Sequence, residues 1–173
     1  MEVIEQLVEV EQPISVVYDQ WTQFEDFPCF MESIVEVSQT DDKRLHWKAV
    51  IAGREKEWDA EIFEQVPEKR IAWRSMNGVK NSGSVTFAEI TPELTRVTVH
   101  LSYEPEGIIE NLAGMLGFAV ARVTDDLQRF KEFIEARGTA SGAWRGYIHG
   151  RNVVPETEIN STSVPQPEGQ PQP

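Results

Sequence analysis

Residues 97–134 have the sequence VTVHLSYEPEGIIENLAGMLGFAVARVTDDLQRFKEFI, and the spacing of their apolar residues changes once along this stretch. Up to Tyr103, alternate residues are apolar, which is typical of a β-strand with one buried face. From Ile109 onward, apolar residues recur at intervals of three and four, as on one face of an α-helix. The stretch therefore predicts a strand that ends at Pro105 and Gly107 and is followed by a long amphipathic helix.

The predicted helix carries a single apolar stripe, made of Ile109, Leu112, Leu116, Ala119, Val123, Leu127, Phe130 and Ile134. Arg137 followed by Gly138 fits a C-terminal cap. Gly114 and Gly117 fall early in the helix, where each glycine costs about 1 kcal/mol relative to alanine. We therefore expect the helix to bend or to approach the sheet closely there.

Four segments upstream of residue 97 alternate in the same way, namely 45–51, 58–62, 71–75 and 85–87. Gly53 separates the first two, and Asn77-Gly78 lies before the last. An Asn-Gly pair is typical of a type I′ hairpin turn, in which both central residues have positive φ. Successive alternating segments joined by short turns predict an antiparallel meander with one buried face.

The N-terminal residues predict a strand over 2–10, two short helices and a second strand over 33–38. Pro13 suits the first turn of the first helix, and Pro28 interrupts the second. The complete order predicts an α+β fold. In it a seven-stranded antiparallel sheet wraps around one long C-terminal helix, with the two short helices between the first and second strands.

The chain of 173 residues is expected to form one domain over residues 1–150 and a disordered tail over residues 151–173. The tail is rich in Pro and Gln and contains no aromatic residue after Tyr147. Such a composition offers too little apolar surface to offset the entropy lost on ordering.

Charge and composition exclude several classes of partner. With 16 Lys and Arg against 29 Asp and Glu, the net charge is −13, which would repel the phosphates of nucleic acids. The longest uncharged apolar stretch, Leu112–Ala121, is far shorter than the roughly 20 residues of a membrane span. No signal peptide is recognisable, and the single Cys29 suits a reducing compartment, so we expect a cytoplasmic protein without stable membrane insertion.

The usual catalytic and metal-binding patterns are missing from the sequence. His46, His100 and His149 are scattered, and none has the spacing of a metal site. His46 and His100 alternate with the apolar residues of their strands, so they are expected on the solvent side. Glu57, Asp59 and Glu61 follow the same rule. We therefore predict no catalytic residue, no metal and no cofactor.

The inward face of the sheet is instead rich in aromatic residues, and it also carries small or polar side chains such as Ser75, Asn81 and Gly83. A plain core would avoid polar groups, whereas an apolar pocket uses a few of them to orient a ligand. The alternative is that the aromatic residues simply form the core. The candidate cavity residues are Trp47, Trp58, Trp73, Ser75, Asn81, Phe87, Val99, Tyr103, Met115 and Phe118.

Several ordered motifs carry a family resemblance. Residues 13–31 have the pattern P-x4-Y-x2-W-x2-F-E-D-F-P-x-F-M, and further matches are WDAEI at 58–62, PEKRIAWRS at 67–75, LQRFKEFIE at 127–135 and GAWRG at 142–146. As a set, spanning about residues 2–148, they resemble a bacterial branch of the polyketide cyclase/dehydrase family. This family belongs to the START and birch-pollen-allergen superfamily of helix-grip proteins, which also includes coenzyme Q-binding START proteins.

The resemblance implies the helix-grip fold and an apolar cavity between the sheet and the long helix. Some members of the superfamily cyclise and dehydrate polyketide chains, and others carry lipids, quinones or hormones without catalysis. Because no inward histidine or acid is predicted on the sheet, we favour a non-catalytic protein that binds an apolar or amphipathic small molecule. The alternatives are a polyketide cyclase or dehydratase, in which Tyr103, Ser75 or Asn81 polarises a carbonyl, and a ligand-free module that binds a protein through Trp144 or the tail.

Overall fold

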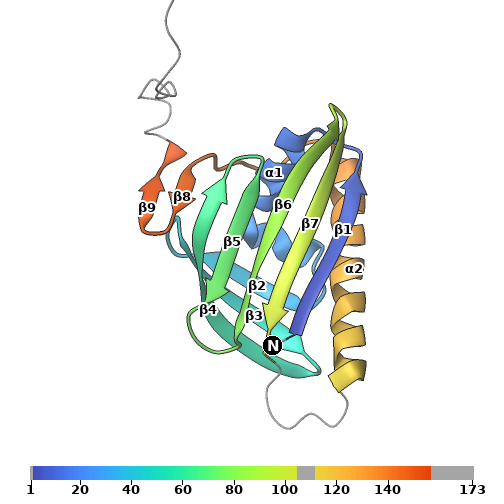
Figure 1. The fold of residues 1–173 in the computed structure, drawn as a ribbon, viewed down its shortest axis with the longest axis vertical. Coiled ribbons are helices and arrows are strands. Elements are labelled where there is room, and N and C mark those ends of the chain that lie inside the picture. Colours follow the sequence, from blue (N-terminus) through green and yellow to red (C-terminus); the bar gives the residue numbers. More distant parts are fainter. Residues whose placement is uncertain (1, 105–111, 157–173) are drawn as a thin grey trace, which may run out of the picture.

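A computed structural model describes residues 2–104 and 112–156, with only the backbone of residues 112–115. Its main strands, in chain order, are β1 (Glu2–Val10), β2 (Ile34–Gln39), β3 (Arg44–Ile51), β4 (Arg54–Val66), β5 (Arg70–Ser75), β6 (Asn81–Thr91) and β7 (Leu94–Tyr103). The remaining elements are α1 (Ile14–Trp21), the 3-10 helix η1 (Phe24–Cys29), α2 (Leu112–Arg137), β8 (Tyr147–His149) and β9 (Asn152–Val154). The expected strand, two short helices, meander and long helix are all present (Figure 1).

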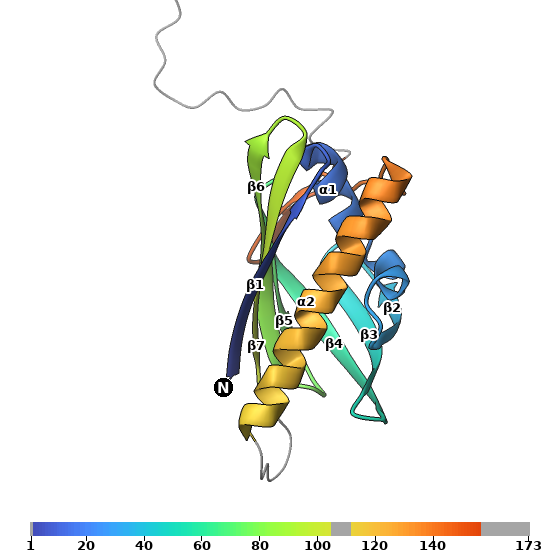
Figure 2. The same ribbon diagram turned by 90° about the vertical axis from the view of Figure 1, so that its right-hand side faces the viewer.

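The seven main strands form one antiparallel sheet in the order β1-β7-β6-β5-β4-β3-β2. From β2 to β7, strands that follow one another in the chain are also neighbours in the sheet. β1 pairs with β7 over its whole length, from Glu2 opposite Tyr103 to Val10 opposite Thr95. The sheet bends around α2, so that β1 and β7 lie on one side of the helix and β2 and β3 on the other (Figure 2). The predicted helix-grip architecture is confirmed.

The two ends of α2 meet very different surroundings. In the C-terminal half, Leu127, Phe130 and Ile134 are at most 3% exposed. The Phe130 ring centroid lies 5.1 Å from those of both Trp21 and Phe30, so α1 and η1 clamp the helix from one side. Phe118, near the start of the helix, is 57% exposed. The helix is thus anchored by its C-terminal half, and its N-terminal half spans an opening above the sheet.

The type I′ turn lies at a different hairpin from the expected one. Ala52 and Gly53 both have positive φ, 51° and 77°, and they join β3 to β4. At the expected hairpin Gly78 has a positive φ but Asn77 does not, so residues 77–78 do not form a type I′ turn. The Asn77 side chain accepts a hydrogen bond from the Asp59 N–H at 2.9 Å and donates one to the Asp59 carboxylate at 2.8 Å, which fixes a longer β5–β6 connection against β4. Gly78 is required there because a Cβ would lie 2.4 Å from the Glu57 carbonyl oxygen.

The C-terminal boundary also needs correction. Residues 152–154, predicted as part of the tail, form β9, which pairs with β8. β8 in turn extends the sheet by pairing with Glu64 and Gln65 of β4, and its Ile148 is 1% exposed. These strands were missed because each contains only three residues. Residues 157–173 of the predicted tail lie outside the described residues.

The segment that follows α2 is fastened to α1. The Arg145 guanidinium lies 3.0 Å from the Asp19 carboxylate and 2.9 Å from that of Glu68, and it also covers the Tyr18 ring. Trp144 is partly buried and packs against the main core. Trp144 therefore contributes to core packing while it stays partly exposed, and partner binding through it stays a prediction.

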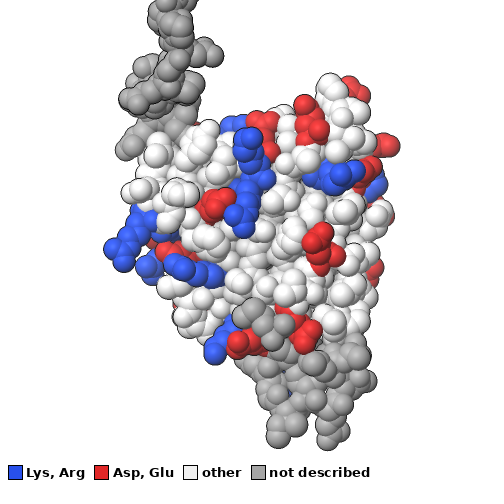
Figure 3. All heavy atoms as spheres, viewed as in Figure 1, with Lys and Arg blue, Asp and Glu red and all other residues white. Residues whose placement is uncertain are grey.

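The outer surface carries most of the charge. Basic side chains lie beside acidic ones on the face shown in Figure 3. Three arginines form ion pairs with acids, namely Arg70–Glu64, Arg74–Glu61 and Arg96–Glu9. Such exposed pairs contribute little to stability. The acidic side chains on this surface are therefore best regarded as solvated charges.

The anchoring of α2 can be tested with two phenylalanine substitutions. We expect Phe130→Ala to lower the free energy of unfolding by roughly 3–5 kcal/mol, because it opens a cavity between α1, η1 and α2. Phe118→Ala, in the exposed half of the same helix, is expected to change it by about 0.5 kcal/mol or less. Urea unfolding followed by circular dichroism measures both. Similar losses for the two variants would show that α2 is held evenly along its length.

Candidate functional site

A cavity of about 500 Å³ lies between the sheet and the N-terminal half of α2. Strands β3 to β7 supply most of the wall, η1 and the residues after it supply one end, and α2 closes the opposite side. Val50, Ile51 and Phe118 line the opening, where each is more than 40% exposed. The cavity is therefore continuous with solvent near the β3–β4 hairpin and the start of α2.

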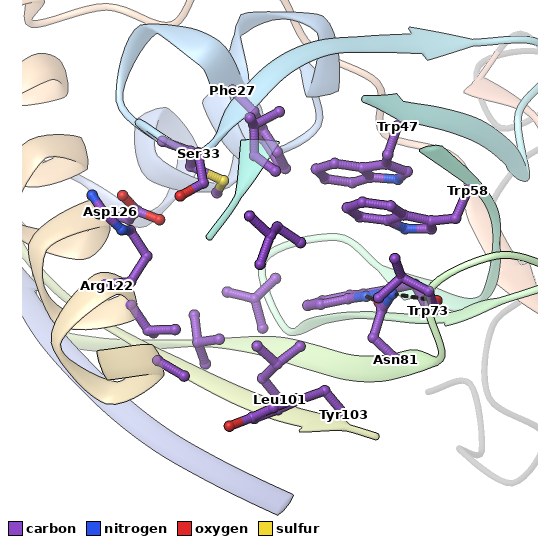
Figure 4. A pocket seen from close by; sticks show the side chains of 18 of the residues that line it. Phe27, Ser33, Trp47, Trp58, Trp73, Asn81, Leu101, Tyr103, Arg122 and Asp126 are labelled. Atoms are coloured by element: carbon purple, nitrogen blue, oxygen red, sulfur yellow. Dashed lines mark hydrogen bonds between the residues drawn. The ribbon is translucent and has the colours of Figure 1, made fainter. Parts of the chain in front are cut away.

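Three indoles form one side of the cavity (Figure 4). Trp47 and Trp58 are directly paired across β3 and β4, and their rings stack with an interplanar angle of 3° and a centroid distance of 5.9 Å. Trp73 of β5 lies over Gly83 of β6. A Cβ at residue 83 would come within 2.7 Å of the Trp73 ring, so this glycine makes room for the indole.

A group of polar residues lies on the side of the cavity opposite the indoles. Figure 4 shows Ser33, Arg122 and Asp126 grouped together, away from the indoles. Arg122 forms an ion pair with Glu32, and Arg129 lies 3.0 Å from the same carboxylate. This network holds the Arg122 side chain along the edge of the cavity.

Asp126 is the acid of this group. One of its oxygens, Oδ1, accepts a long hydrogen bond of 3.4 Å from the Glu32 N–H. Burial raises the pKa of the Asp126 carboxyl to about 6, although that hydrogen bond and the nearby charges of Arg122 and Arg129 act in the opposite direction. A carboxyl with such a pKa exchanges its proton near neutral pH.

Most of the predicted cavity residues lie where the sequence placed them. Those that line the cavity are Trp47, Trp58, Trp73, Asn81, Val99, Tyr103 and Phe118. Asn81 also has a structural role, because both ends of its amide bind the protein. Its oxygen accepts from the Trp73 indole N–H at 3.4 Å, and its nitrogen donates to the Val79 carbonyl at 3.1 Å. Asn81 therefore holds Trp73 in place.

Two predicted residues with described side chains, Phe87 and Ser75, do not line the cavity. Phe87 packs in the core beneath α1, where its ring meets that of Tyr18 edge to face at 5.3 Å. Ser75 lies at the end of β5 outside the cavity, and its hydroxyl accepts a hydrogen bond from the Asn81 N–H at 3.1 Å. The side chain of Met115 lies outside the described residues.

The sequence reasoning missed the polar pair on α2. The predicted absence of an inward acid concerned the strands, whereas Asp126 reaches the cavity from the helix. A signal was available, because Arg122 and Asp126 each directly precede a residue of the apolar stripe, Val123 and Leu127. Trp21, the last residue of α1, was not among the candidate residues either, and it lines the cavity as well.

The histidines of β3 and β7 lie on the outer side of the sheet, as expected. His46 Nδ1 lies 2.7 Å from an Asp59 oxygen, and His100 Nε2 lies 2.9 Å from Glu5. Within residues 2–104 and 112–156, no group of three or more His, Cys, Asp or Glu side chains could hold a metal ion. The helices of the described part of the chain include none that is long and apolar enough to cross a membrane.

Comparison with known families supports the resemblance seen in the motifs. Residues 10–132 match the model of the family described as polyketide cyclase / dehydrase and lipid transport. The chain belongs to this family. An uncharacterized 17.2 kDa protein of Streptomyces lincolnensis, from the melC2-rnhH intergenic region, is 40% identical over 149 residues, which cover 86% of this chain and 99% of that protein.

Solved structures of several other proteins share the fold. A Deinococcus radiodurans protein is 30% identical, with a TM-score of 0.63 over 79% of this chain and 99% of that one. The Zhui aromatase/cyclase of a Streptomyces species is 17% identical, with a TM-score of 0.65 over 82% of this chain and 98% of that one. A START superfamily protein of Mycobacterium smegmatis is 15% identical, with a TM-score of 0.64 over 76% of this chain and 98% of that one.

The raised pKa of Asp126 predicts a pH-dependent effect on stability in this family member. Because the folded protein holds the Asp126 proton more tightly than the unfolded chain, protonation favours folding at low pH, and this contribution is lost as pH rises through about 6. Asp126→Asn lacks the buried charge. We expect it to be about 1 kcal/mol more stable than the wild type at neutral pH, after allowance for partial exposure, and equally stable near pH 4.

Urea unfolding of both proteins across this pH range measures the difference between them, which isolates Asp126 from the other carboxylates. A difference that stays constant with pH would contradict the assignment of the raised pKa to this residue.

Proposed function

We propose that this protein binds an apolar or amphipathic small molecule in the cavity between the sheet and α2. The observation that carries the proposal is the cavity itself, whose volume of about 500 Å³ falls within the range of ligand sites. Protein interiors are normally close-packed, and an unfilled apolar space lowers stability. An open space of this size, lined by large aromatic side chains, is therefore best explained by an occupant.

The lining indicates the kind of occupant. Trp47, Trp58 and Trp73 present indole surface, which packs well against planar rings and against aliphatic chains. Quinones, lipids and polyketide-like compounds all offer such surface. Affinity would come mainly from apolar area, at roughly 25 cal/mol per Å² before the costs of association. The cytoplasmic location expected from the sequence stays a prediction.

A second candidate is a cyclase or dehydratase, and the Asp126 carboxyl favours it. An acid with a pKa of about 6 can donate or accept a proton near neutral pH, as condensation and dehydration require. Tyr103 also lines the cavity and could donate a hydrogen bond to a carbonyl. Conversion of a poly-β-ketone substrate, followed by mass spectrometry and abolished in Asp126→Asn, would support catalysis. Binding of that substrate without conversion would support the carrier function instead.

Filling the cavity tests the binding function. Leu101 of β7 lines the cavity, and Leu101→Trp places a large side chain in it. We expect this substitution to weaken binding of menadione, a small quinone, roughly tenfold or more, because the ligand loses its space. Isothermal titration calorimetry measures the dissociation constant, and circular dichroism verifies that the fold persists.

Thr98→Trp is the matched control, since Thr98 lies on the same strand but does not line the cavity. It should leave menadione binding unchanged. Equal affinity of the wild type and Leu101→Trp would contradict binding in this cavity. Absence of binding by the wild type to menadione, to a long-chain fatty acid and to any co-purifying apolar compound detectable by native mass spectrometry would contradict the function as a whole.

A further inference from the structure

We propose that Arg122 and Asp126 form the polar end of the binding site and select a neutral ligand that carries a hydroxyl group at one end of an apolar body. This inference rests on the proposed binding function and specifies the class of ligand. Both residues lie on α2, one helical turn apart, and both line the cavity.

Arg122 supplies an unused donor. Its Nη1 pairs with Glu32 at the surface, but its Nε is buried and, among the described residues, has no hydrogen-bond partner. Buried polar groups without a partner are uncommon, because leaving one unpaired costs the free energy of its desolvation. A ligand oxygen in the cavity would accept from this N–H and remove that cost.

Asp126 supplies an acceptor beside it. Oδ1 accepts the hydrogen bond of 3.4 Å from the Glu32 N–H, and no hydrogen bond to Oδ2 is formed within the described part of the chain. Above about pH 6 the carboxyl is ionised, and an ionised carboxylate only accepts. The ligand group that meets both residues must therefore accept from Arg122 and donate to Asp126.

A hydroxyl group does both, since it has one O–H and two lone pairs. A carboxylate cannot donate, and it would add a negative charge beside Asp126 and Glu32. An ammonium cannot accept, and it would lie beside Arg122 and Arg129. Glu32 and Asp126 already match the charges of Arg122 and Arg129, and Asp125 adds a further negative charge nearby. An anionic ligand is therefore disfavoured, and an uncharged ligand with a hydroxyl group fits the pair best.

The rest of the cavity fixes the orientation. The indoles of Trp47, Trp58 and Trp73 stand on the side opposite the polar pair (Figure 4). The apolar body would pack against the indoles, and the hydroxyl would point toward α2. Ser33, on the same side as the polar pair, offers a further hydroxyl within that end of the cavity.

Three probes of matched shape test this selection on the full chain: 2-naphthol, naphthalene and 2-naphthoate. We expect 2-naphthol to bind roughly tenfold more tightly than naphthalene at pH 7.5, through two hydrogen bonds to charged groups, and 2-naphthoate to bind more weakly than 2-naphthol. Calorimetric titration gives the three dissociation constants. This comparison uses the wild type and so does not depend on the folding of any variant.

The variant Asp126→Leu removes the acceptor while keeping the shape of the side chain. It should abolish the preference for 2-naphthol over naphthalene and leave naphthalene binding within about threefold of the wild type, which also reports that the cavity is intact. Asp125→Leu is the matched control, because Asp125 is the adjacent exposed acid and does not line the cavity. It should retain the full preference.

Equal binding of 2-naphthol and naphthalene by the wild type would overturn this inference and leave the apolar binding function standing. Tightest binding of 2-naphthoate would also overturn it, since Arg122 would then act as an anion site. Retention of the preference in Asp126→Leu would exclude Asp126 as the selecting group. Failure of all three probes, together with failure of menadione, would overturn the binding function as well.

Discussion

The packing of Phe130 between Trp21 and Phe30 is the contact on which the rest of the structure depends. It holds the C-terminal half of α2 against α1 and η1, at one end of a sheet that bends around the helix. The cavity lies between the sheet and the part of α2 that precedes this anchor. The place where the helix is fixed therefore decides where space is left above the sheet.

The sheet keeps this space open with large side chains that are themselves held in place. Trp47 and Trp58 stack across two strands, and Trp73 rests on Gly83 with its indole N–H bound to Asn81. Rings fixed in this way cannot rotate freely into the cavity. The unfilled space costs stability, so the aromatic clusters around α1, η1 and the C-terminal half of α2 must supply the compensating burial.

The sequence predicted what repeats along the chain and missed what depends on a single contact. Alternation and helical spacing gave the meander and α2, because both patterns extend over many residues. The β8–β9 hairpin has too few residues for a pattern, and the turn at Asn77 is decided by its side-chain bonds to Asp59. The alternation along the strands predicted which strand residues face inward. Phe87 also faces inward but is covered by α1, whose position no strand pattern reveals.

The same helix joins the anchor to the polar site. Arg122, Asp126 and Phe130 follow one another at intervals of four residues, so they lie along one face of α2. Glu32, only two residues after Phe30, binds Arg122 and Arg129 and donates its N–H to Asp126. The aromatic clamp and the polar pair are therefore positioned by the same short segment of chain. In the proposed complex, a polar pair next to the anchored part of the helix would hold the ligand hydroxyl in a fixed orientation, and the apolar body would enter beside Phe118.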